Sequence, residues 1–401
     1  MILDGIRILS FTTGIAGPNA GRILASLGAE VIKVESRSGG VDAFRYFGVG
    51  DDLNSSARFA EANLGVRSLT VDLKQPDGIA LIQRLAGLCD VVLENYRPGV
   101  LDRLGLGYPA LKAIRPDIIV VKMPGLGSTG PMRGYGTWGA LLNAYSGLTW
   151  LWNHAGATTP VGNQGVFPDY LSAVLAPMVV VSALINRQTT GLGSVIDLAQ
   201  SEATAFCALP QAMLHVSVNG SDPEPIGNRS RDRAVQGVYP CAGVDRWCAI
   251  RVESNEQLAE LLAVIAEDAA PDGAHMPADL DAAITGHDAL DQRIAGWTRE
   301  RSPEAVMAAL QSRGVSAGTV ASGADLLVDP QLDRAGFIRH LVQPGIGEMV
   351  IPGLPMEVDP PIIHEPGPAA ALGQDNDYVL RTLLSLSEEE CVALAEAGVL
   401  V

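Results

Sequence analysis

Four basic side chains stand where an α/β sheet could bind a phosphorylated ligand. Arg37 and Lys74 follow two predicted strands, and Arg97 and Arg103 lie in the segment behind another. Ligands of open α/β sheets bind at the carboxyl ends of the strands, and clustered cations bind phosphate groups well. These residues are candidates for a phosphate site, although their positions alone favour ordinary solvated loop residues.

A single carboxylate, Asp169, precedes the longest apolar segment of the sequence, residues 171–185. Aspartate at the start of a helix often serves as an N-cap, where it accepts backbone N–H groups. In an apolar setting shaped by Phe167 and Pro168, the same carboxylate can act as a nucleophile. Its position in the sequence leaves both roles open.

The segment Gly125-Leu126-Gly127-Ser128-Thr129-Gly130 fits the GxGxxG pattern of dinucleotide-binding loops and follows a predicted strand. The acidic residue expected about 20 positions later is missing, because residues 145–152 read YSGLTWLW. Pro131 and further glycines at 134 and 136 also interrupt the start of a helix. A plain glycine-rich loop therefore explains the segment better than NAD binding.

Other chemistry has little support in the sequence. The six histidines show no HxxxH spacing and have no cysteines at ligand spacing, so no metal site is predicted. The sequence contains neither a GxSxG motif nor a P-loop. Five cysteines form no CxxC pair, which is typical of a protein from a reducing compartment.

The elements that must position these residues follow a regular alternation in the first 200 residues. Nearly continuous apolar strands are predicted at 6–11, 29–35, 68–73, 90–95 and 117–123, with helices between several of them. This alternation is typical of a parallel, doubly wound sheet of the α/β class. The apolar segment at 171–185 contains Pro177 and is shorter than the ~20 residues needed to cross a bilayer, so it predicts a buried core helix.

The rest of the chain predicts a second, smaller domain. Residues 219–233 are polar and rich in turn formers, which indicates a linker. Residues 234–329 contain two strand candidates and several helical segments, so an α+β domain is expected there. Residues 1–218 and 330–401 are assigned to the large, ligand-binding, Rossmann-like domain, whose stretch 377–400 predicts two helices.

Composition excludes several function classes. The 401 residues include 28 basic and 45 acidic side chains, so the formal net charge is −17. Such a chain repels phosphate backbones and anionic membranes, and neither nucleic acid nor a membrane is an expected partner. A hydrophobic content of 47% is too high for intrinsic disorder. The segment MILDGIRILSF has no basic n-region, so no signal peptide is predicted and a cytoplasmic location is expected.

A set of motifs occurs in order along the chain. They are Ala16-Gly17-Pro18, Leu27-Gly28-Ala29-Glu30-Val31-Ile32-Lys33-Val34-Glu35, Val71-Asp72-Leu73-Lys74, Glu94-Asn95-Tyr96-Arg97-Pro98-Gly99-Val100, the loop 125–131 and, near the end, Leu372-Gly373-Gln374-Asp375, Ser387-Glu388-Glu389-Glu390 and Ala397-Gly398-Val399. Together they resemble the motifs of the family III CoA-transferases, the group of formyl-CoA and carnitine CoA-transferases. The resemblance covers nearly the whole chain.

The resemblance implies an acyl-CoA:carboxylate CoA-transferase that works through Asp169. The aspartate attacks the thioester carbonyl to give a mixed anhydride, and CoA leaves as the thiolate. Exchange of acyl groups on the aspartate, through an aspartyl thioester, then lets CoA depart with the acceptor acid. Covalent catalysis conserves the energy of the thioester, and backbone N–H groups of glycine-rich loops are suited to stabilise the oxyanions.

The resemblance also implies a site for CoA, which is a substrate here and not a permanently bound cofactor. Carried over by position, this site comprises Ile15, Ala16, Arg37, Val71, Asp72, Leu73, Lys74, Asn95, Tyr96, Arg97, Arg103, Thr137, Trp138, Gly139 and Ala140. The expected partners are an acyl-CoA and a carboxylic acid. The family fold implies a homodimer of two elongated, two-domain chains that interlock.

Two departures from the family pattern concern the substrate. Many members carry Tyr-Asp, and the related 2-methylacyl-CoA racemases carry His-Asp, where this chain has Trp138-Gly139. A racemase needs paired bases at the α-carbon, so racemisation is disfavoured but stays an alternative. Val66 stands where the family usually has a basic residue, which removes one expected phosphate contact. A non-catalytic CoA- or NAD-binding module is the remaining alternative.

Aromatic side chains crowd the segment before Asp169. Trp138, Tyr145, Trp150 and Trp152 predict a buried aromatic cluster, with an acyl-binding pocket as the alternative.

Overall fold

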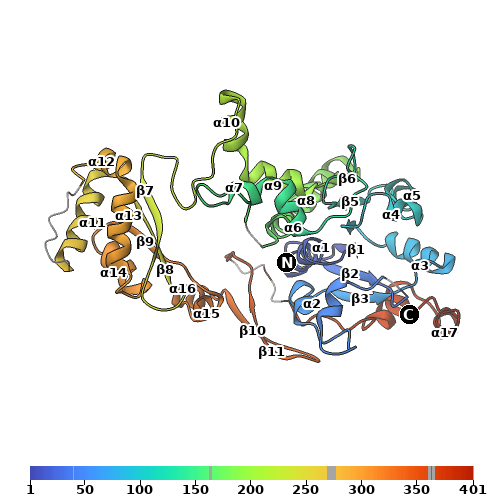
Figure 1. Cartoon of the computed structure of the whole chain (residues 1–401). Coiled ribbons are helices and arrows are strands. Elements are labelled where there is room, and N and C mark those ends of the chain that lie inside the picture. The colour runs from blue at the N-terminus through green and yellow to red at the C-terminus, as the bar shows by residue number, and fades with distance from the viewer. Residues whose placement is uncertain (39, 162–164, 269–276, 360–362, 364–365, 401) are drawn as a thin grey trace. The chain divides into compact units, whose positions relative to one another are not determined.

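The computed structural model describes residues 1–38, 40–161, 165–268, 277–359, 363 and 366–400, and the chain divides into two compact units (Figure 1). Unit 1 comprises Met1–Thr149, Asn163–Asp222 and Arg334–Val401, and unit 2 comprises Trp150–Gly162 and Pro223–Asp333. Residues 150–161 therefore group with the second unit, although the sequence prediction placed them in the large domain. The boundary between Asp222 of unit 1 and Pro223 of unit 2 falls within the predicted linker, residues 219–233.

Unit 1 is built on a six-stranded parallel sheet of order β3-β2-β1-β4-β5-β6. Its strands are β1 (Arg7–Phe11), β2 (Glu30–Glu35), β3 (Arg67–Thr70), β4 (Val91–Glu94), β5 (Ile119–Lys122) and β6 (Ser194–Asp197). The first five correspond to the five predicted strands, so the parallel α/β prediction is confirmed. The sequence prediction missed β6, a short edge strand whose side chains are only partly buried.

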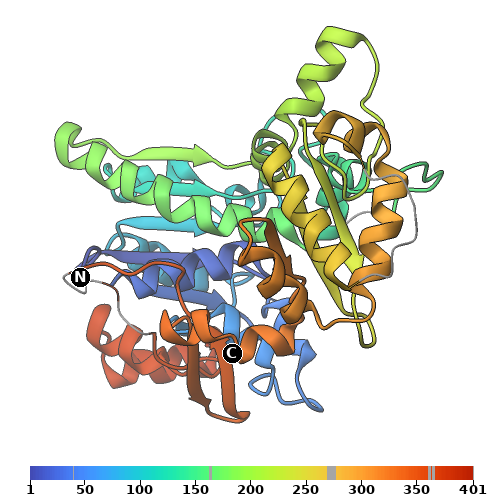
Figure 2. The ribbon, with the colours of Figure 1, turned by 90° about the vertical axis from the view of Figure 1, so that its left-hand side faces the viewer.

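Helices cover both faces of this sheet (Figures 1 and 2). On one face, α1 (Ala16–Ser26) and α8 (Phe167–Thr190) pack against alternate strand residues such as Ile8 and Val121. On the other face, α3 (Pro76–Ala86), α4 (Val100–Arg103), α5 (Tyr108–Ile114) and the C-terminal helices pack against residues such as Leu9 and Val120. Because successive strand residues point to opposite faces and helices cover both, the residues of the inner strands are mostly buried, including polar ones such as Ser10 and Lys33.

Helix α8 is long and apolar enough to cross a membrane by length and composition alone. Its inner side, including Ala176, Val180 and Leu184, packs instead into the core against α1 and the sheet. It is therefore a core helix of unit 1, as the sequence predicts for 171–185, and Pro177 lies within it.

The C-terminal segment returns to the edge of the sheet, so residues distant in sequence share one unit (Figure 1). The Asp375 carboxylate accepts hydrogen bonds from the Arg67 guanidinium and from the Ser68 backbone N–H, both at 2.9 Å. Two helices follow, the π-helix η2 (Tyr378–Leu383) and α17 (Glu388–Glu396). Ser387 and Glu390 form a capping box at the start of α17.

Shorter elements of unit 1 surround the carboxyl ends of the strands or extend from the sheet. They are η1 (Ala43–Phe47), α2 (Ala57–Ala62), α6 (Gly139–Tyr145), α9 (Gln200–Ala208), α10 (Pro210–Asn219), β10 (Ile338–Gln343) and β11 (Gly347–Pro352). Two further short helices, α7 (Leu148–Leu151) and α16 (Pro330–Arg334), contain the residues at which the chain passes from one unit to the other. Strands β10 and β11 form an antiparallel hairpin.

Unit 2 contains an antiparallel sheet of β7 (Val235–Pro240), β8 (Trp247–Val252) and β9 (Ser316–Thr319). Its helices are α11 (Asn255–Asp268), α12 (Leu280–Thr285), α13 (His287–Thr298), α14 (Pro303–Gln311) and α15 (Gly323–Leu327). The buried side chains of β7 and β8 pack with those of α11, α13 and α14 to form a separate core. The second unit thus has an α+β composition of its own.

Candidate active site

A pocket of about 340 Å³ lies at the carboxyl ends of the parallel strands. Residues that follow four of the strands line this pocket. They are residues 13–15 after β1, Asn95 after β4, Gly125 after β5 and Gln200 after β6. The strand order reverses between β1 and β4, and ligands of doubly wound sheets bind at this switch point. Asp169 lines the same pocket.

Asp169 lies within the first turn of α8, which begins at Phe167. The N-cap residue is Val166, and no side chain caps this helix. The predicted alternative that Asp169 is an N-cap is therefore wrong, because Pro168 and Phe167 already belong to the helix. The Oδ2 atom of Asp169 is buried without a hydrogen-bond partner among the described residues. Burial raises the pKa of this carboxyl to about 6.

Gly139, the first residue of α6, lies directly against this carboxylate. A Cβ atom at position 139 would overlap Oδ2 of Asp169 and would lie 2.8 Å from Cβ of Val166. Only glycine leaves space for the carboxylate in its observed position.

The loop after β1 is fixed by side chains from neighbouring strand ends. The side-chain amide of Asn95 accepts a hydrogen bond from the Thr13 N–H (2.9 Å) and donates one to the Thr13 carbonyl (2.8 Å). The Asp42 carboxylate accepts from the Gly14 N–H (3.0 Å) and pairs with Lys33 Nζ (2.6 Å). Lys33 and Asp42 are both buried, and Asp42 links this ion pair to Gly14, which lines the pocket.

Of the residues predicted to bind CoA, six line the pocket beside Asp169. They are Ile15, Asn95, Thr137, Trp138, Gly139 and Ala140. The other predicted residues, Ala16, Arg37, Val71, Asp72, Leu73, Lys74, Tyr96, Arg97 and Arg103, lie outside it. Ala16 is fully buried at the start of α1.

The predicted residues after β2 and β3 are brought together by a loop contact. Lys74 Nζ donates to the Ser38 carbonyl at 2.8 Å, which joins the loop that contains Arg37 to the segment that contains Asp72. The Lys74 backbone N–H donates to the Asp72 carboxylate and helps to hold its pKa below the usual value. Val71 is buried in the core, whereas Arg37 and Lys74 are exposed.

The predicted residues after β4 lie beside the segment that precedes α6. A Cβ atom at Gly136 would overlap the guanidinium of Arg97, so these two loops are in contact. Arg97 and Arg103 are exposed, and Tyr96 packs against the core. Arg37, Lys74 and Arg97 thus lie on loops after β2, β3 and β4, and Arg103 lies at the end of α4; all four are outside the pocket that contains Asp169.

The glycine-rich segment 125–130 is a loop. Gly125 lines the pocket, and the backbone N–H and hydroxyl of Ser128 donate to the Asp197 carboxylate at 2.7 and 3.0 Å. The next helix begins only at Gly139. A dinucleotide-binding loop would lead directly into a helix, so the geometry agrees with a plain glycine-rich loop.

The predicted buried aromatic cluster is wrong. Trp138, Tyr145 and Trp152 are 66%, 53% and 43% exposed, because they lie on or beside short helices whose other faces pack on the protein. Trp138 belongs to the pocket, while Trp150 and Trp152 belong to unit 2.

Several pocket residues had no signal in the sequence. Gln200 follows β6, a strand that the sequence did not predict. The Nε2 atom of Gln200 donates a hydrogen bond to the Met123 carbonyl at 3.0 Å. Its Oε1 atom is buried without a hydrogen-bond partner among the described residues. Phe44, Phe47 and Arg58 come from η1 and α2, which bear no motif.

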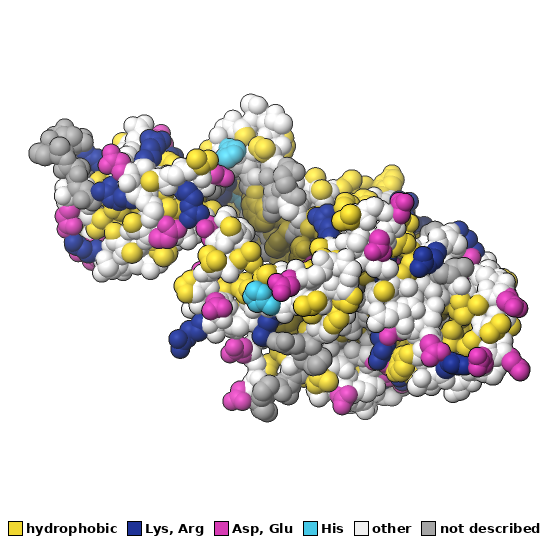
Figure 3. Space-filling view, turned by 90° about the horizontal axis from the view of Figure 1, so that it is seen from below, with side chains coloured by type: hydrophobic (Ala, Val, Ile, Leu, Met, Phe, Trp, Pro, Cys, Tyr) yellow, Lys and Arg dark blue, Asp and Glu magenta, His cyan; other side chains and the backbone are white. Residues whose placement is uncertain are grey.

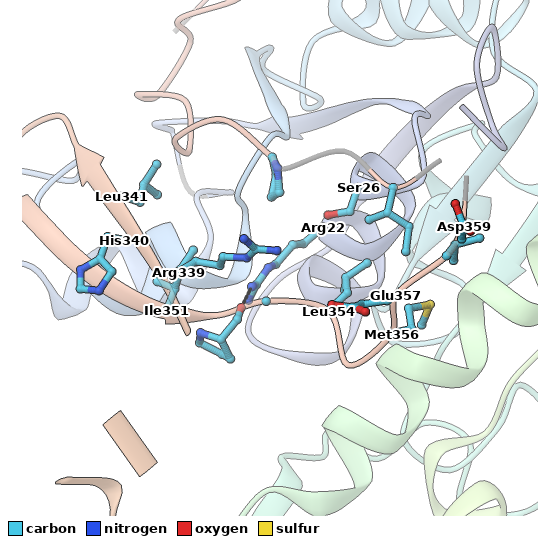
Figure 4. Close-up of a pocket in the computed structure, with 15 residues that line it drawn as sticks. Arg22, Ser26, Arg339, His340, Leu341, Ile351, Leu354, Met356, Glu357 and Asp359 are labelled. Atoms are coloured by element: carbon cyan, nitrogen blue, oxygen red, sulfur yellow. Dashed lines mark hydrogen bonds between the residues drawn. The ribbon is translucent and has the colours of Figure 1, made fainter. Parts of the chain in front are cut away.

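A larger cavity, of about 620 Å³, lies elsewhere in unit 1 (Figure 4). It is lined by Arg22 and Ser26 of α1, by Arg339 and His340 of β10, and by acidic residues such as Glu357. It contains none of the predicted site residues and presents both signs of charge, so the smaller pocket at the strand ends is the better candidate.

In the part of the chain that is described, no group of three or more His, Cys, Asp and Glu side chains is placed to hold a metal ion. On the face in Figure 3, Lys and Arg side chains are interspersed with Asp and Glu.

Known proteins resemble this chain along its length. The model of CoA-transferase family III matches residues 3–376. The chain is 30% identical to the probable CoA-transferase Rv1866 of Mycobacterium tuberculosis over 99% of its own length, but it spans only half of that protein. It is 31% identical to succinyl-CoA–D-citramalate CoA-transferase of Chloroflexus aurantiacus, over 98% of this chain and 96% of the relative.

A solved structure has the same fold. The crystal structure of a CAIB/BAIF family protein from Brucella suis superposes with a TM-score of 0.84 at 27% identity, over 95% of this chain and 99% of the other. The family match, the relatives and the parallel sheet with its strand-end pocket lead to one conclusion: the chain belongs to CoA-transferase family III.

Proposed function

We propose that this protein is an acyl-CoA:carboxylate CoA-transferase in which Asp169 is the nucleophile. One observation carries the proposal: a carboxylate with a buried, unpartnered oxygen lines the pocket at the switch point of the sheet. An unpartnered buried carboxylate costs stability, and such groups concentrate at functional sites.

The environment of Asp169 suits attack on a thioester. Burial raises its pKa to about 6, so at neutral pH the carboxylate is ionised yet more basic than an exposed aspartate. One carboxylate oxygen forms a bond to the thioester carbonyl carbon, and the C–S bond breaks to release CoA thiolate and leave a mixed anhydride. The thiolate then attacks the aspartyl carbonyl, which releases the donor acid and forms an aspartyl thioester. The acceptor carboxylate displaces CoA, and the thiolate attacks the new acyl group to regenerate Asp169.

The oxyanions formed in these steps need hydrogen-bond donors. The Gly14 N–H is already bound to Asp42, so it does not serve. We assign oxyanion stabilisation to backbone N–H groups of the glycine-rich loop after β5, which reaches the pocket at Gly125.

The CoA nucleotide is proposed to bind outside the pocket, on the loops after β2, β3 and β4. These loops present Arg37, Lys74 and Arg97, and the adjoining helix α4 presents Arg103, as exposed cations in a protein of net charge −17. Cationic side chains of this kind bind phosphate oxygens, and the pantetheine arm would lead into the pocket past Asn95 and Thr137.

A homodimer of interlocked chains in the cytoplasm is also proposed. The outer side of α8 exposes Tyr170, Val174, Met178 and Ile185, which share one face of the helix, and α10 has no buried residue. Contiguous exposed apolar surface of this kind marks an interface, and a second copy of the chain would cover it.

The test is transfer of CoA from a donor thioester to a free acid, followed by mass spectrometry of the CoA products. The wild type is expected to form the acceptor thioester, and Asp169→Ala to lose transfer while it still binds CoA. Entry of solvent deuterium at the α-carbon without an acceptor acid would instead indicate a racemase. CoA binding without turnover on any acid would indicate a binding module.

A further inference from the structure

Arg58 lies in the wall of the pocket that contains Asp169. It belongs to the first turn of α2, directly after Ala57. Its guanidinium carbon lies 4.9 Å from the ring centroid of Phe44 and 5.3 Å from that of Phe47. The two rings are 5.6 Å apart at 83°, so they form an angled aromatic support beneath the guanidinium. Contacts of this kind hold an arginine in place and leave its N–H groups free to bind.

The charge of Arg58 is not balanced by a neighbouring carboxylate. No ion pair among the described residues includes Arg58, and Glu61, one turn later on α2, pairs with Arg22 instead. Of the described residues that line the pocket, Arg58 is the one basic side chain and Asp169 the one acidic side chain. The pocket therefore presents a nucleophilic carboxylate and a separate, unneutralised cation.

We infer that Arg58 binds the second carboxylate of a dicarboxylic substrate, and that this enzyme transfers CoA between dicarboxylic acids. The inference rests on the proposed function, since the first carboxyl group is the one activated at Asp169. The guanidinium would hold the distal carboxylate by two parallel N–H···O bonds, a geometry that arginine provides and lysine does not.

The remaining lining of the pocket suits the carbon chain of such an acid. Ile15, Leu142 and Val166 supply apolar surface together with the two phenylalanines. Arg58 is exposed. A monocarboxylic acid of the same length would fill this apolar part but would form no charge-assisted pair with Arg58, so it should bind less tightly than the dicarboxylic acid. The relative from Chloroflexus aurantiacus is named for succinate and citramalate, and both of these acids carry two carboxylates.

The experiment compares CoA transfer to glutarate and to pentanoate, which have five carbons each and differ in one carboxylate. Wild-type protein is expected to prefer glutarate. Arg58→Gln should raise KM for glutarate by about 10- to 100-fold, the effect of losing a charge-assisted hydrogen-bonded pair, and leave KM for pentanoate nearly unchanged. Arg58→Lys should restore part of the loss, since it keeps the charge without the paired N–H geometry.

Arg381→Gln is the matched control, because Arg381 is exposed and pairs with Asp377 and Glu388 at the surface. It removes the same charge and should leave both KM values unchanged. Equal losses for glutarate and pentanoate in Arg58→Gln, or a wild-type preference for pentanoate, would overturn the inference while the transfer reaction itself stands. Absence of transfer to any acid would instead defeat the proposed function.

Discussion

Gly139 leaves the space that the carboxylate of Asp169 occupies, because a Cβ at position 139 would overlap Asp169 Oδ2. In this chain the absence of a side chain at position 139 allows the Asp169 carboxylate to be buried, and burial raises its pKa.

Gly139→Ala is expected to lower kcat by about 10- to 100-fold, because the methyl group displaces the carboxylate from its position. A displaced carboxylate is better solvated, so the acid limb of the pH profile should also move to lower pH. Steady-state kinetics at several pH values measure both effects. Gly134→Ala is the control, since a Cβ there meets nothing within 4 Å. Unchanged kcat in Gly139→Ala would show that the packing against Asp169 has no role.

The rate of acylation should follow the ionisation of Asp169. Its folded pKa is raised to about 6, and only the ionised form attacks. We expect kcat/KM to be level above pH 7 and to fall tenfold per pH unit well below pH 6. Stopped-flow measurement of CoA release tests this. If kcat/KM instead began to fall only near pH 4, where an unperturbed aspartate titrates, the result would contradict a pKa raised by burial.

Glu94 predicts a pH-dependent stability effect that is separate from the chemistry. Burial is the largest cause that raises its pKa to about 7, and Lys122 Nζ, 4.0 Å away, only partly offsets it. An acid with a raised folded pKa binds its proton more tightly in the native state, so stability falls as pH rises from about 4.5 through 7. Glu94→Gln should therefore raise the melting temperature at pH 8 relative to the wild type, with little difference at pH 4.5. Differential scanning calorimetry measures the melting temperatures of both proteins at pH 4.5 and pH 8. An equal difference between variant and wild type at the two pH values would exclude an effect of Glu94 titration.

The Lys33–Asp42 pair predicts a large loss of stability when one partner is removed. Both side chains are almost fully buried, and Asp42 also accepts the Gly14 N–H. Lys33→Met should destabilise unit 1 by about 3–5 kcal/mol, because it leaves a buried carboxylate without its cation. Urea denaturation followed by circular dichroism measures the loss. Lys112→Met, at an exposed position of α5, should change stability by less than about 1 kcal/mol.

The regular part of the fold could be predicted from the sequence because each central strand is buried on both faces. Val91–Glu94 and Ile119–Lys122 are continuous apolar runs apart from their last residue, and such runs have few alternatives. Strand β6 is half exposed at the edge of the sheet, so its four residues carry no comparable pattern.

The pocket could be predicted only in part, since it is assembled from loops. Asp169 and Thr137–Ala140 were assigned by position from the family resemblance, and the structure brings them together in one pocket. Arg58 and Gln200 come from segments without a motif, and only tertiary packing places them beside Asp169. Trp138 was expected in a buried cluster but is exposed. Its exposure depends on which face of the adjoining helix α6 packs on the protein, and a helix of seven residues is too short to show a clear hydrophobic periodicity in the sequence.

Covalent capture at Asp169 tests the central claim most directly. The protein is incubated with an acyl-CoA and hydroxylamine, digested, and the peptide that contains residue 169 is examined by mass spectrometry. The account predicts a hydroxamate on Asp169 that depends on the acyl-CoA and does not occur on the exposed Asp77. An unmodified Asp169, together with full transfer activity in Asp169→Ala, would contradict it.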